Sequence, residues 1–219
     1  MKKQFLGAVA IAVAGLVCQI PALARAPFPD PAVDTPPGSL HGKQTAVLAG
    51  GCFWGMEGVF ERVIGVTNVV SGFSGGEAST AHYEIVSTGR TGHAESVKIT
   101  YDPSRITFGQ LLKIYFSVAH NPTELNRQGP DEGTQYRSAI FYQNDEQKHI
   151  AEAYIQQLGA AHVFRRPIVT QVVPFKAFYA AEAYHQHYLD NNPTQPYIVY
   201  NDLPKIEALK KEYPQLCRR

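Results

Sequence analysis

The feature that most constrains the fold is an alternation between strand-type and helix-type hydrophobic spacing from residue 44 onward. Apolar residues at every second position, or in short runs closed by Gly, Pro or Asp, predict strands, whereas recurrence every three or four positions predicts helices. The strands are expected at 45–49, 66–73, 95–101 and 138–142, and the helices at 53–63 and 107–118, with Thr107 as an N-cap. This βαββαβ order predicts an α/β (α+β) fold in which helices pack on a mixed or antiparallel sheet, as in the ferredoxin-like split βαβ arrangement.

The spacing is less regular after residue 142. A helix is expected at 145–159, a strand at 168–173, a helix at 179–189 and a charged helix at 205–213. We therefore expect an irregular C-terminal extension of the core. Because neither an internal repeat nor a second linker interrupts residues 44–219, this segment is predicted to be one domain that buries its own core.

The N-terminal segment has the composition of an export signal. Two lysines precede an uncharged apolar run from Phe5 to Ile20, and small residues with A-x-A spacing follow at 22–26. This pattern predicts a cleavable signal peptide over residues 1–26. The alternative, a retained membrane anchor, is disfavoured because the run is shorter than the ~20 apolar residues that a membrane span needs. We expect a secreted or periplasmic protein with a Pro-rich linker at 27–43.

Charge and cysteine content exclude several functional classes. Lys and Arg number 20 against 19 Asp and Glu, so no net positive field attracts nucleic acid. Three cysteines are too few for a disulfide-stapled scaffold. Cys18 lies within the predicted signal peptide, which leaves Cys52 and Cys217 in an oxidising compartment. We expect no nucleic-acid partner, no membrane partner after signal cleavage, and a monomer.

A glycine-flanked cysteine marks the point where the first predicted strand turns into the first predicted helix. Backbone N–H groups are unpaired there and the helix dipole is positive, so the thiolate of Cys52 is favoured. Flanking glycines let the backbone bend and a substrate approach, and Phe53 and Trp54 place aromatic surface beside the sulfur. Cys52 is therefore a candidate nucleophile. The alternative is a buried structural cysteine.

Two further polar regions are candidates for the same site. Polar residues at 82–95 end in Glu95, which opens a strand with an apolar far end. Partial burial would raise the pKa of Glu95 and make it a proton donor, whereas the alternative is a solvated glutamate at a strand edge. A long polar loop at 121–137 precedes the strand at 138–142, and loops of this length in compact domains are usually functional.

Three separate motifs carry a resemblance to a family. The runs Gly-Cys-Phe-Trp-Gly at 51–55, Thr-Gly-His-Ala-Glu at 91–95 with Tyr-Asp-Pro at 101–103, and Gly-Thr-Gln-Tyr-Arg-Ser at 133–138 resemble the A-type peptide-methionine sulfoxide reductases. The first run is the most specific. The resemblance extends over residues 45–189, and the two-layer α/β sandwich that it implies agrees with the predicted order of elements.

The resemblance implies catalytic roles for four residues. Cys52 matches the cysteine whose thiolate attacks the sulfoxide sulfur and becomes a sulfenic acid as methionine leaves. Glu95 matches the acid that protonates the sulfoxide oxygen, and Tyr83 and Tyr136 match the tyrosines whose hydroxyls hold that oxygen. Elementary chemistry agrees, because the sulfoxide oxygen leaves only if it is protonated and bound by donors.

Substrate binding and partners follow from the same resemblance. Phe53 and Trp54 match the apolar pocket for the S-methyl group, and Asp131 matches a polar residue at its edge. The implied activity is reduction of the S-epimer of methionine sulfoxide, free or in proteins, with electrons from a thioredoxin-like partner. We expect no bound cofactor and no metal, because His185 and His187 diverge within a predicted helix and no Cys-x-x-Cys is present.

The C-terminal segment departs from the family pattern. Many members resolve the sulfenic acid with a cysteine in a Gly-rich tail, whereas residues 191–219 contain no glycine and a single cysteine, Cys217. Cys217 is the candidate resolving residue, because a disordered end could reach back to Cys52. The alternative is that Cys217 is a spare exposed thiol and a partner reduces Cys52 directly.

Two other functional classes stay open. A different cysteine enzyme, such as a thiol hydrolase, would need a histidine base, for which His82, His93 and His120 are available. A non-enzymatic peptide-binding module would use the aromatic surface and would tolerate replacement of Cys52 by Ser.

Overall fold

A computed structural model describes residues 27–218 of the chain. The predicted signal peptide at 1–26, including Cys18, lies outside the described residues. Within residues 27–218, no helix is both long enough and apolar enough to cross a membrane.

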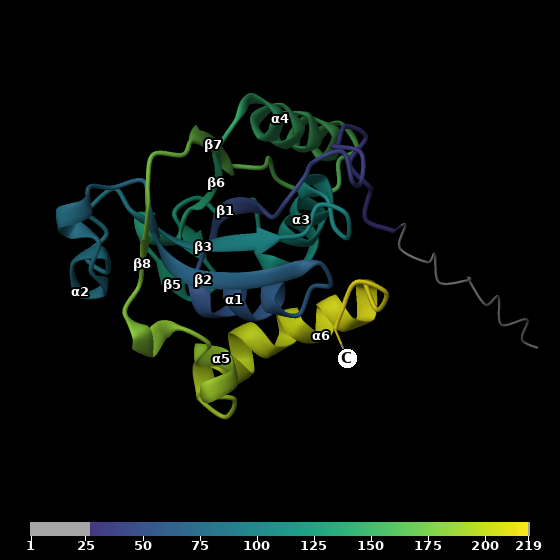
Figure 1. Cartoon of the computed structure of the whole chain (residues 1–219). Coiled ribbons are helices and arrows are strands. Elements are labelled where there is room, and N and C mark those ends of the chain that lie inside the picture. Colours follow the sequence, from purple (N-terminus) through teal and green to yellow (C-terminus); the bar gives the residue numbers. More distant parts are fainter. Residues whose placement is uncertain (1–26, 219) are drawn as a thin grey trace, which may run out of the picture.

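A six-stranded mixed sheet forms the centre of the molecule (Figure 1), in the order β7-β6-β1-β3-β2-β8. The strands are β1 (Gln44–Gly50), β2 (Val66–Ser74), β3 (Ala94–Tyr101), β6 (Ser138–Tyr142), β7 (Gln171–Pro174) and β8 (Phe178–Ala180). Neighbours are antiparallel except for the parallel pair β6 and β7. β3 therefore lies between β1 and β2, as a split βαβ unit requires. The predicted mixed α+β class is confirmed.

Helices pack against this sheet from several parts of the chain. The helices are α1 (Phe53–Glu61), α2 (Tyr83–Val86), α3 (Phe108–Ile114), α4 (Asp145–Ala160), α5 (Tyr188–Asn191) and α6 (Leu203–Glu212). Single turns of 3-10 helix occur at Ala78–Thr80, Thr134–Tyr136 and Ala183–His185, π-helical turns at Tyr115–Ala119 and Ile198–Asp202, and a small ribbon at β4 (Arg127–Gln128) and β5 (Asp131–Glu132). Figure 1 shows α6 running beside α1.

The predicted start of α3 is confirmed. Thr107 Oγ1 accepts the Gln110 N–H at 3.1 Å, and the Gln110 side chain accepts the Thr107 N–H at 3.0 Å. This reciprocal capping box satisfies two N–H groups that the first turn of a helix leaves unpaired.

Strand alternation divides the core between the two faces of the sheet. Leu48, Val97 and Ile99 belong to the large cluster that includes the helices, whereas Val47 and Ala49 belong to a small cluster on the opposite face. Since side chains two residues apart share a face, Glu95 projects toward the helices together with Val97.

The predicted helix at 179–189 is wrong. The chain instead forms β8, which pairs with the outer edge of β2, and then two short turns. Gln186 binds the backbone of Ser71 through both of its side-chain polar atoms, at 3.0 Å each, and His187 has a left-handed backbone with φ of 54°. Pairing with an open strand edge and these tertiary hydrogen bonds override the local helical spacing.

The Pro-rich segment at 27–43 contains no helix or strand, and it packs along α3 and α4. The Tyr154 hydroxyl donates to the Pro29 carbonyl at 2.6 Å, and Lys113 pairs with Asp30 at 2.6 Å. Asp34 accepts the Gly109 N–H at 2.9 Å, at the positive end of α3. These contacts hold the extended segment on the domain surface.

Candidate active site

Cys52 lies between β1 and α1, where the sequence predicted a turn from strand to helix. It is the N-cap of α1 and its residue is 8% exposed. Gly51 has φ of +89°, and a Cβ there would come within 2.6 Å of Gln128. Only glycine fits this turn without strain, so the turn geometry fixes where the Cys52 sulfur lies.

Glu95 faces Cys52 from the start of β3. Its carboxylate oxygen Oε2 accepts the Phe53 N–H at 3.1 Å, and its residue is 2% exposed. The alternative of a solvated glutamate at a strand edge is therefore wrong. Burial raises the pKa of Glu95 to about 8, although the Phe53 N–H partly opposes this by stabilising the carboxylate. At neutral pH Glu95 is thus mostly a neutral acid that has a proton to give.

The thiol of Cys52 does not have the lowered pKa that its helix-terminal position predicts. Burial raises its pKa well above the usual value, and the carboxylates of Glu95 and Asp202 add to this. The Trp54 N–H and the Lys205 ammonium act in the opposite direction. Desolvation outweighs the helix terminus because the sulfur is almost fully enclosed. The resting form is a thiol, and protonation of Glu95 removes one of the two repulsive charges.

Tyr83 and Tyr136 come to this site from different elements. Tyr83 begins α2, and its ring lies 6.4 Å from the Phe53 ring in a stacked arrangement. Tyr136 ends the 3-10 turn that precedes β6. Burial raises the pKa of both hydroxyls, and the charge of Glu95 is the next cause for each. Both therefore remain protonated hydrogen-bond donors beside Glu95.

An aromatic wall continues from Phe53 to Trp54. The Trp54 ring stacks on Tyr188 with ring centres 3.8 Å apart, and its indole N–H donates to His185 Nδ1 at 3.1 Å. Tyr197 meets the same indole edge-on at 5.9 Å. The helix predicted over 179–189 would have placed His185 and Tyr188 differently, and no pattern in the sequence pointed to Tyr197.

Asp131 contacts this wall, because its Oδ2 atom accepts a hydrogen bond from the Tyr197 hydroxyl. Burial raises the pKa of the Asp131 carboxyl. The small ribbon of β4 and β5 therefore contacts the C-terminal extension beside the aromatic wall. The structure brings together all seven residues that were predicted for catalysis and substrate binding: Cys52, Phe53, Trp54, Tyr83, Glu95, Asp131 and Tyr136.

A buried ion pair that the sequence analysis missed lies against the first turn of α1. Asp202 is fully buried, and Lys205 Nζ is 3.1 Å from its Oδ1 atom. A Cβ on Gly55 would come within 2.1 Å of that oxygen, so glycine is required for this approach. The only signal in the sequence was an Asp and a Lys three residues apart at the start of a charged helix.

The histidines do not supply a base for the thiol. His93 is buried, and its ring nitrogens contact the Gly76 N–H at 3.2 Å and the Glu77 carbonyl at 3.0 Å. Burial lowers the pKa of His120 to about 3, and its Nδ1 contacts the Tyr115 carbonyl at 2.9 Å. His82 is exposed. Within residues 27–218 none of the three has a polar contact with Cys52, which disfavours a cysteine hydrolase.

Cys217 does not join the site. It pairs with Val63 in an isolated β-bridge, and the Arg218 N–H donates to the Arg62 carbonyl at 2.7 Å. Its residue is 7% exposed, so the alternative of an exposed thiol is wrong. Val63 follows α1 and Cys52 precedes it, which separates the two cysteines by roughly 15 Å along the helix.

These features are typical of a cysteine-dependent enzyme. A buried thiol at a helix N-terminus lies next to a largely neutral carboxylic acid, two protonated tyrosines and an aromatic wall, so a sulfur nucleophile and a proton are available at adjacent positions.

Comparison with known proteins identifies the family. The model of the family "Peptide methionine sulfoxide reductase" matches residues 44–216, and the chain belongs to this family. Peptide methionine sulfoxide reductase MsrA 2 of Mesorhizobium japonicum is 63% identical over 175 residues, which cover 80% of this chain and 90% of that protein. MsrA 2 of a Synechocystis species is 50% identical over 205 residues, covering 91% and 96%.

Solved structures agree with this family. Reduced Mxr1 of Saccharomyces cerevisiae has a TM-score of 0.62 and 35% identity, covering 70% of this chain and 87% of that one. Methionine sulfoxide reductase A of Corynebacterium diphtheriae has a TM-score of 0.62 and 38% identity, covering 72% and 78%. The predicted family and enzyme class are confirmed.

The ion pair beside Cys52 leads to a prediction about thiol reactivity. Lys205→Met removes the cation that favours the thiolate and leaves Asp202 uncompensated, so alkylation of Cys52 by iodoacetamide at pH 7 should slow by roughly threefold or more. Asp202→Asn should accelerate it. Mass spectrometry of the Cys52 peptide across a pH series measures both. Lys210→Met, in an exposed pair on the same helix, is the control and should leave the rate unchanged.

Proposed function

We propose that this chain reduces the S-epimer of methionine sulfoxide, in proteins and as the free amino acid, to methionine. The observation that carries the proposal is the hydrogen bond between the Phe53 N–H and the Glu95 carboxyl. It places a largely neutral acid next to the residue that follows Cys52, so one substrate atom can meet the thiol while its neighbour meets the proton donor. The named relatives support the same activity.

The proposed first step transfers the sulfoxide oxygen to Cys52. Glu95 protonates that oxygen and recovers a proton from the Cys52 thiol, and the hydroxyls of Tyr83 and Tyr136 donate hydrogen bonds to the oxygen as the sulfur–oxygen bond of the substrate breaks. Cys52 sulfur loses two electrons and becomes a sulfenic acid, and the substrate sulfur gains them and becomes a thioether. The thiol and the sulfoxide together contain every atom of the products, so this step needs no bound cofactor.

The aromatic wall is proposed to hold the S-methyl group. Phe53 is 1% exposed, and Trp54 is fixed by stacking on Tyr188 and by the hydrogen bond to His185. An apolar methyl pocket also excludes water, which keeps Glu95 neutral. Because the methyl group, the oxygen and the sulfur each have a separate partner, the site would accept only one configuration at sulfur.

We propose that a thioredoxin-like dithiol regenerates Cys52, with Cys217 as the candidate resolving residue. Tyr213 follows α6, and the chain from Tyr213 to Cys217 spans about 14 Å when fully extended. The two cysteines are separated by roughly 15 Å along α1. Release of the tail from Arg62 and Val63, with unwinding of the last turn of α6, would therefore have to precede a disulfide. Direct reduction of the sulfenic acid by the partner is the alternative.

We also propose that the protein acts outside the cytoplasm. The support is the composition of residues 1–26, which has the features of a cleavable export signal. An oxidising compartment is also where methionine oxidation is a common lesion of proteins, so repair of oxidised proteins is a consistent role.

Epimer selectivity provides the direct test of the proposed activity. The purified protein should consume the S-epimer of a racemic methionine sulfoxide peptide in dithiothreitol and leave the R-epimer, as measured by chiral chromatography. Cys52→Ser should abolish turnover. Consumption of neither epimer would refute the proposal. If the wild type bound the peptide without turning it over, and Cys52→Ser bound it equally well, a peptide-binding module would be favoured.

The pKa of Glu95 predicts the pH dependence of this reaction. The acid form predominates below a pKa of about 8 and is lost above it, so kcat/KM should fall as the pH rises through 8. Glu95→Gln should lower kcat by about 10²–10⁴-fold and remove this limb of the profile. Glu84→Gln, at an exposed position of α2, should change neither. An unaltered profile in Glu95→Gln would contradict the assigned role, and loss of activity in His93→Gln alone would favour a histidine base.

The fate of the sulfenic acid can be read after one turnover without reductant. If Cys217 resolves, mass spectrometry should show an intramolecular Cys52–Cys217 disulfide, and Cys217→Ser should accumulate the sulfenic acid, trapped by dimedone. Truncation of the tail is avoided, because Cys217 is part of the buried core. A sulfenic acid that persists in the wild type, or an intermolecular dimer, would exclude Cys217 as the resolving residue.

A further inference from the structure

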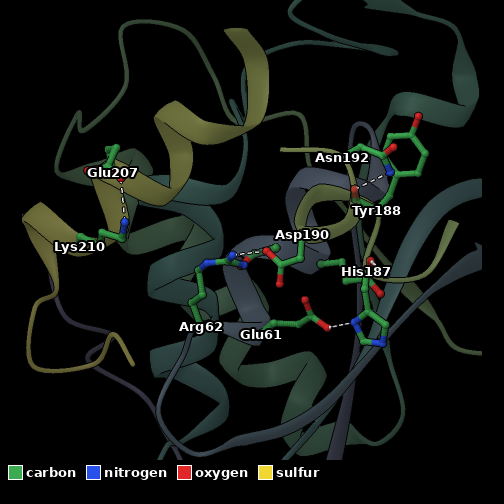
Figure 2. A network of polar contacts seen from close by, with 10 residues as sticks. Glu61, Arg62, His187, Tyr188, Asp190, Asn192, Glu207 and Lys210 are labelled. Carbon is green, nitrogen blue, oxygen red and sulfur yellow. Dashed lines mark hydrogen bonds and ion pairs between the residues drawn. The ribbon is translucent and has the colours of Figure 1, made fainter. Parts of the chain in front are cut away.

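A separate polar cluster joins α1 to the start of α5. Glu57 and Glu61 lie four residues apart on α1 and therefore share a face of the helix. His187 approaches this face from the other segment, with its Nδ1 atom 2.6 Å from Glu61 Oε1, as the dashed line in Figure 2 shows. Its backbone N–H donates to Glu57 Oε2 at 2.9 Å. One side-chain donor atom from each of the three residues lies within 4.8 Å of the others.

One carboxylate oxygen of Glu57 is available as a metal ligand at this cluster. Its residue is fully buried, and its Oε1 atom makes no hydrogen bond of standard geometry in the described part of the chain, although the nearby Ser71 hydroxyl acts to lower the pKa of the carboxyl. The other oxygen of the same carboxylate binds His187, so the group faces the cluster. Burial and repulsion from Glu61 raise the pKa of Glu57 to about 7. A cation between the two carboxylates would supply the missing partner and offset their repulsion.

The cluster is also open to solvent on one side. The side chain of His187 is 59% exposed and that of Glu61 is 19% exposed, so an ion can enter and water can complete its coordination. The nearest guanidinium, that of Arg62, is paired with Asp190 (Figure 2). The site therefore combines a buried carboxylate, a half-buried one and an accessible imidazole.

We propose that Glu57, Glu61 and His187 bind a divalent transition-metal cation, with zinc as its best probe. Two carboxylate oxygens and one imidazole nitrogen form a three-ligand set that zinc accepts, with water as the fourth ligand. Tetrahedral ligands at about 2.0–2.2 Å from zinc lie about 3.4 Å from one another. His187 Nδ1 and Glu61 Oε1, which are 2.6 Å apart, therefore have to separate by about 0.8 Å, and ligand atoms as far apart as 4.8 Å have to approach by about 1.4 Å, both through side-chain rotation.

Metal binding at this place would stiffen one wall of the active site. His187 lies between His185 and Tyr188, and both of these contact Trp54. A bound cation would fasten that segment to α1, on which Trp54 also lies. The site contains none of the residues assigned to the reaction, so its existence does not depend on the proposed activity.

Isothermal titration of zinc chloride tests the site. The protein used carries Cys52→Ser and Cys217→Ser, because thiolates would otherwise bind zinc themselves. We expect one zinc per chain with micromolar affinity, and weakening on the order of tenfold or more in Glu61→Gln and in His187→Asn. Asparagine tolerates the left-handed backbone at 187. His149→Gln, an exposed histidine on α4, is the matched control and should bind like the parent.

A second measurement guards against variants that fail to fold. Circular dichroism first establishes that each variant is folded, and its thermal midpoint is then recorded with and without zinc. Zinc should raise the midpoint of the parent and of His149→Gln, and not of Glu61→Gln or His187→Asn. Absence of saturable binding in the parent, or equal affinity in the parent and in folded Glu61→Gln, would overturn the proposal.

Discussion

The rest of the active site depends on one hydrogen bond, in which the first turn of α1 donates to a carboxyl group from β3. Glu95 is buried on the helical side of the sheet, where an ionised carboxylate is poorly solvated. The Phe53 N–H satisfies one of its oxygens, which makes its burial tolerable without forcing it to ionise. The same contact fixes the direction in which α1 leaves Cys52, and therefore fixes the sulfur relative to the acid.

The C-terminal extension supplies the side chains that complete the active site. Between β8 and α6 it contributes His185, Tyr188 and Tyr197 to the aromatic wall and Asp202 beside the thiol, and the first turn of α6 adds Lys205. Gln186 holds this segment on β2 through the backbone of Ser71. An irregular stretch can be placed this firmly because its side chains replace the hydrogen bonds that a regular element would make within itself.

The core elements were predictable because their hydrophobic spacing is local and strong. The strand at 95–101 and the helix that begins after Thr107 are both where their patterns place them. The segment at 179–189 was not predictable, since its conformation depends on the open edge of β2. The expectation of a lowered pKa for the Cys52 thiol was wrong for a related reason. The position of Cys52 at the start of α1 fixes the sign of the helix dipole at the sulfur, but burial by residues distant in the sequence determines how well the thiolate is solvated.

The sequence by itself determined the order of the core elements and the family, and it predicted seven residues that the structure brings together, since these rest on spacing and on short motifs. Only the tertiary structure decided that Cys217 is buried at the far end of α1, that Asp202 and Lys205 lie beside the Cys52 thiol, and that His187 meets two carboxylates of α1. The physical reason is that burial and electrostatic coupling arise between residues more than a hundred positions apart, whose approach no local pattern encodes.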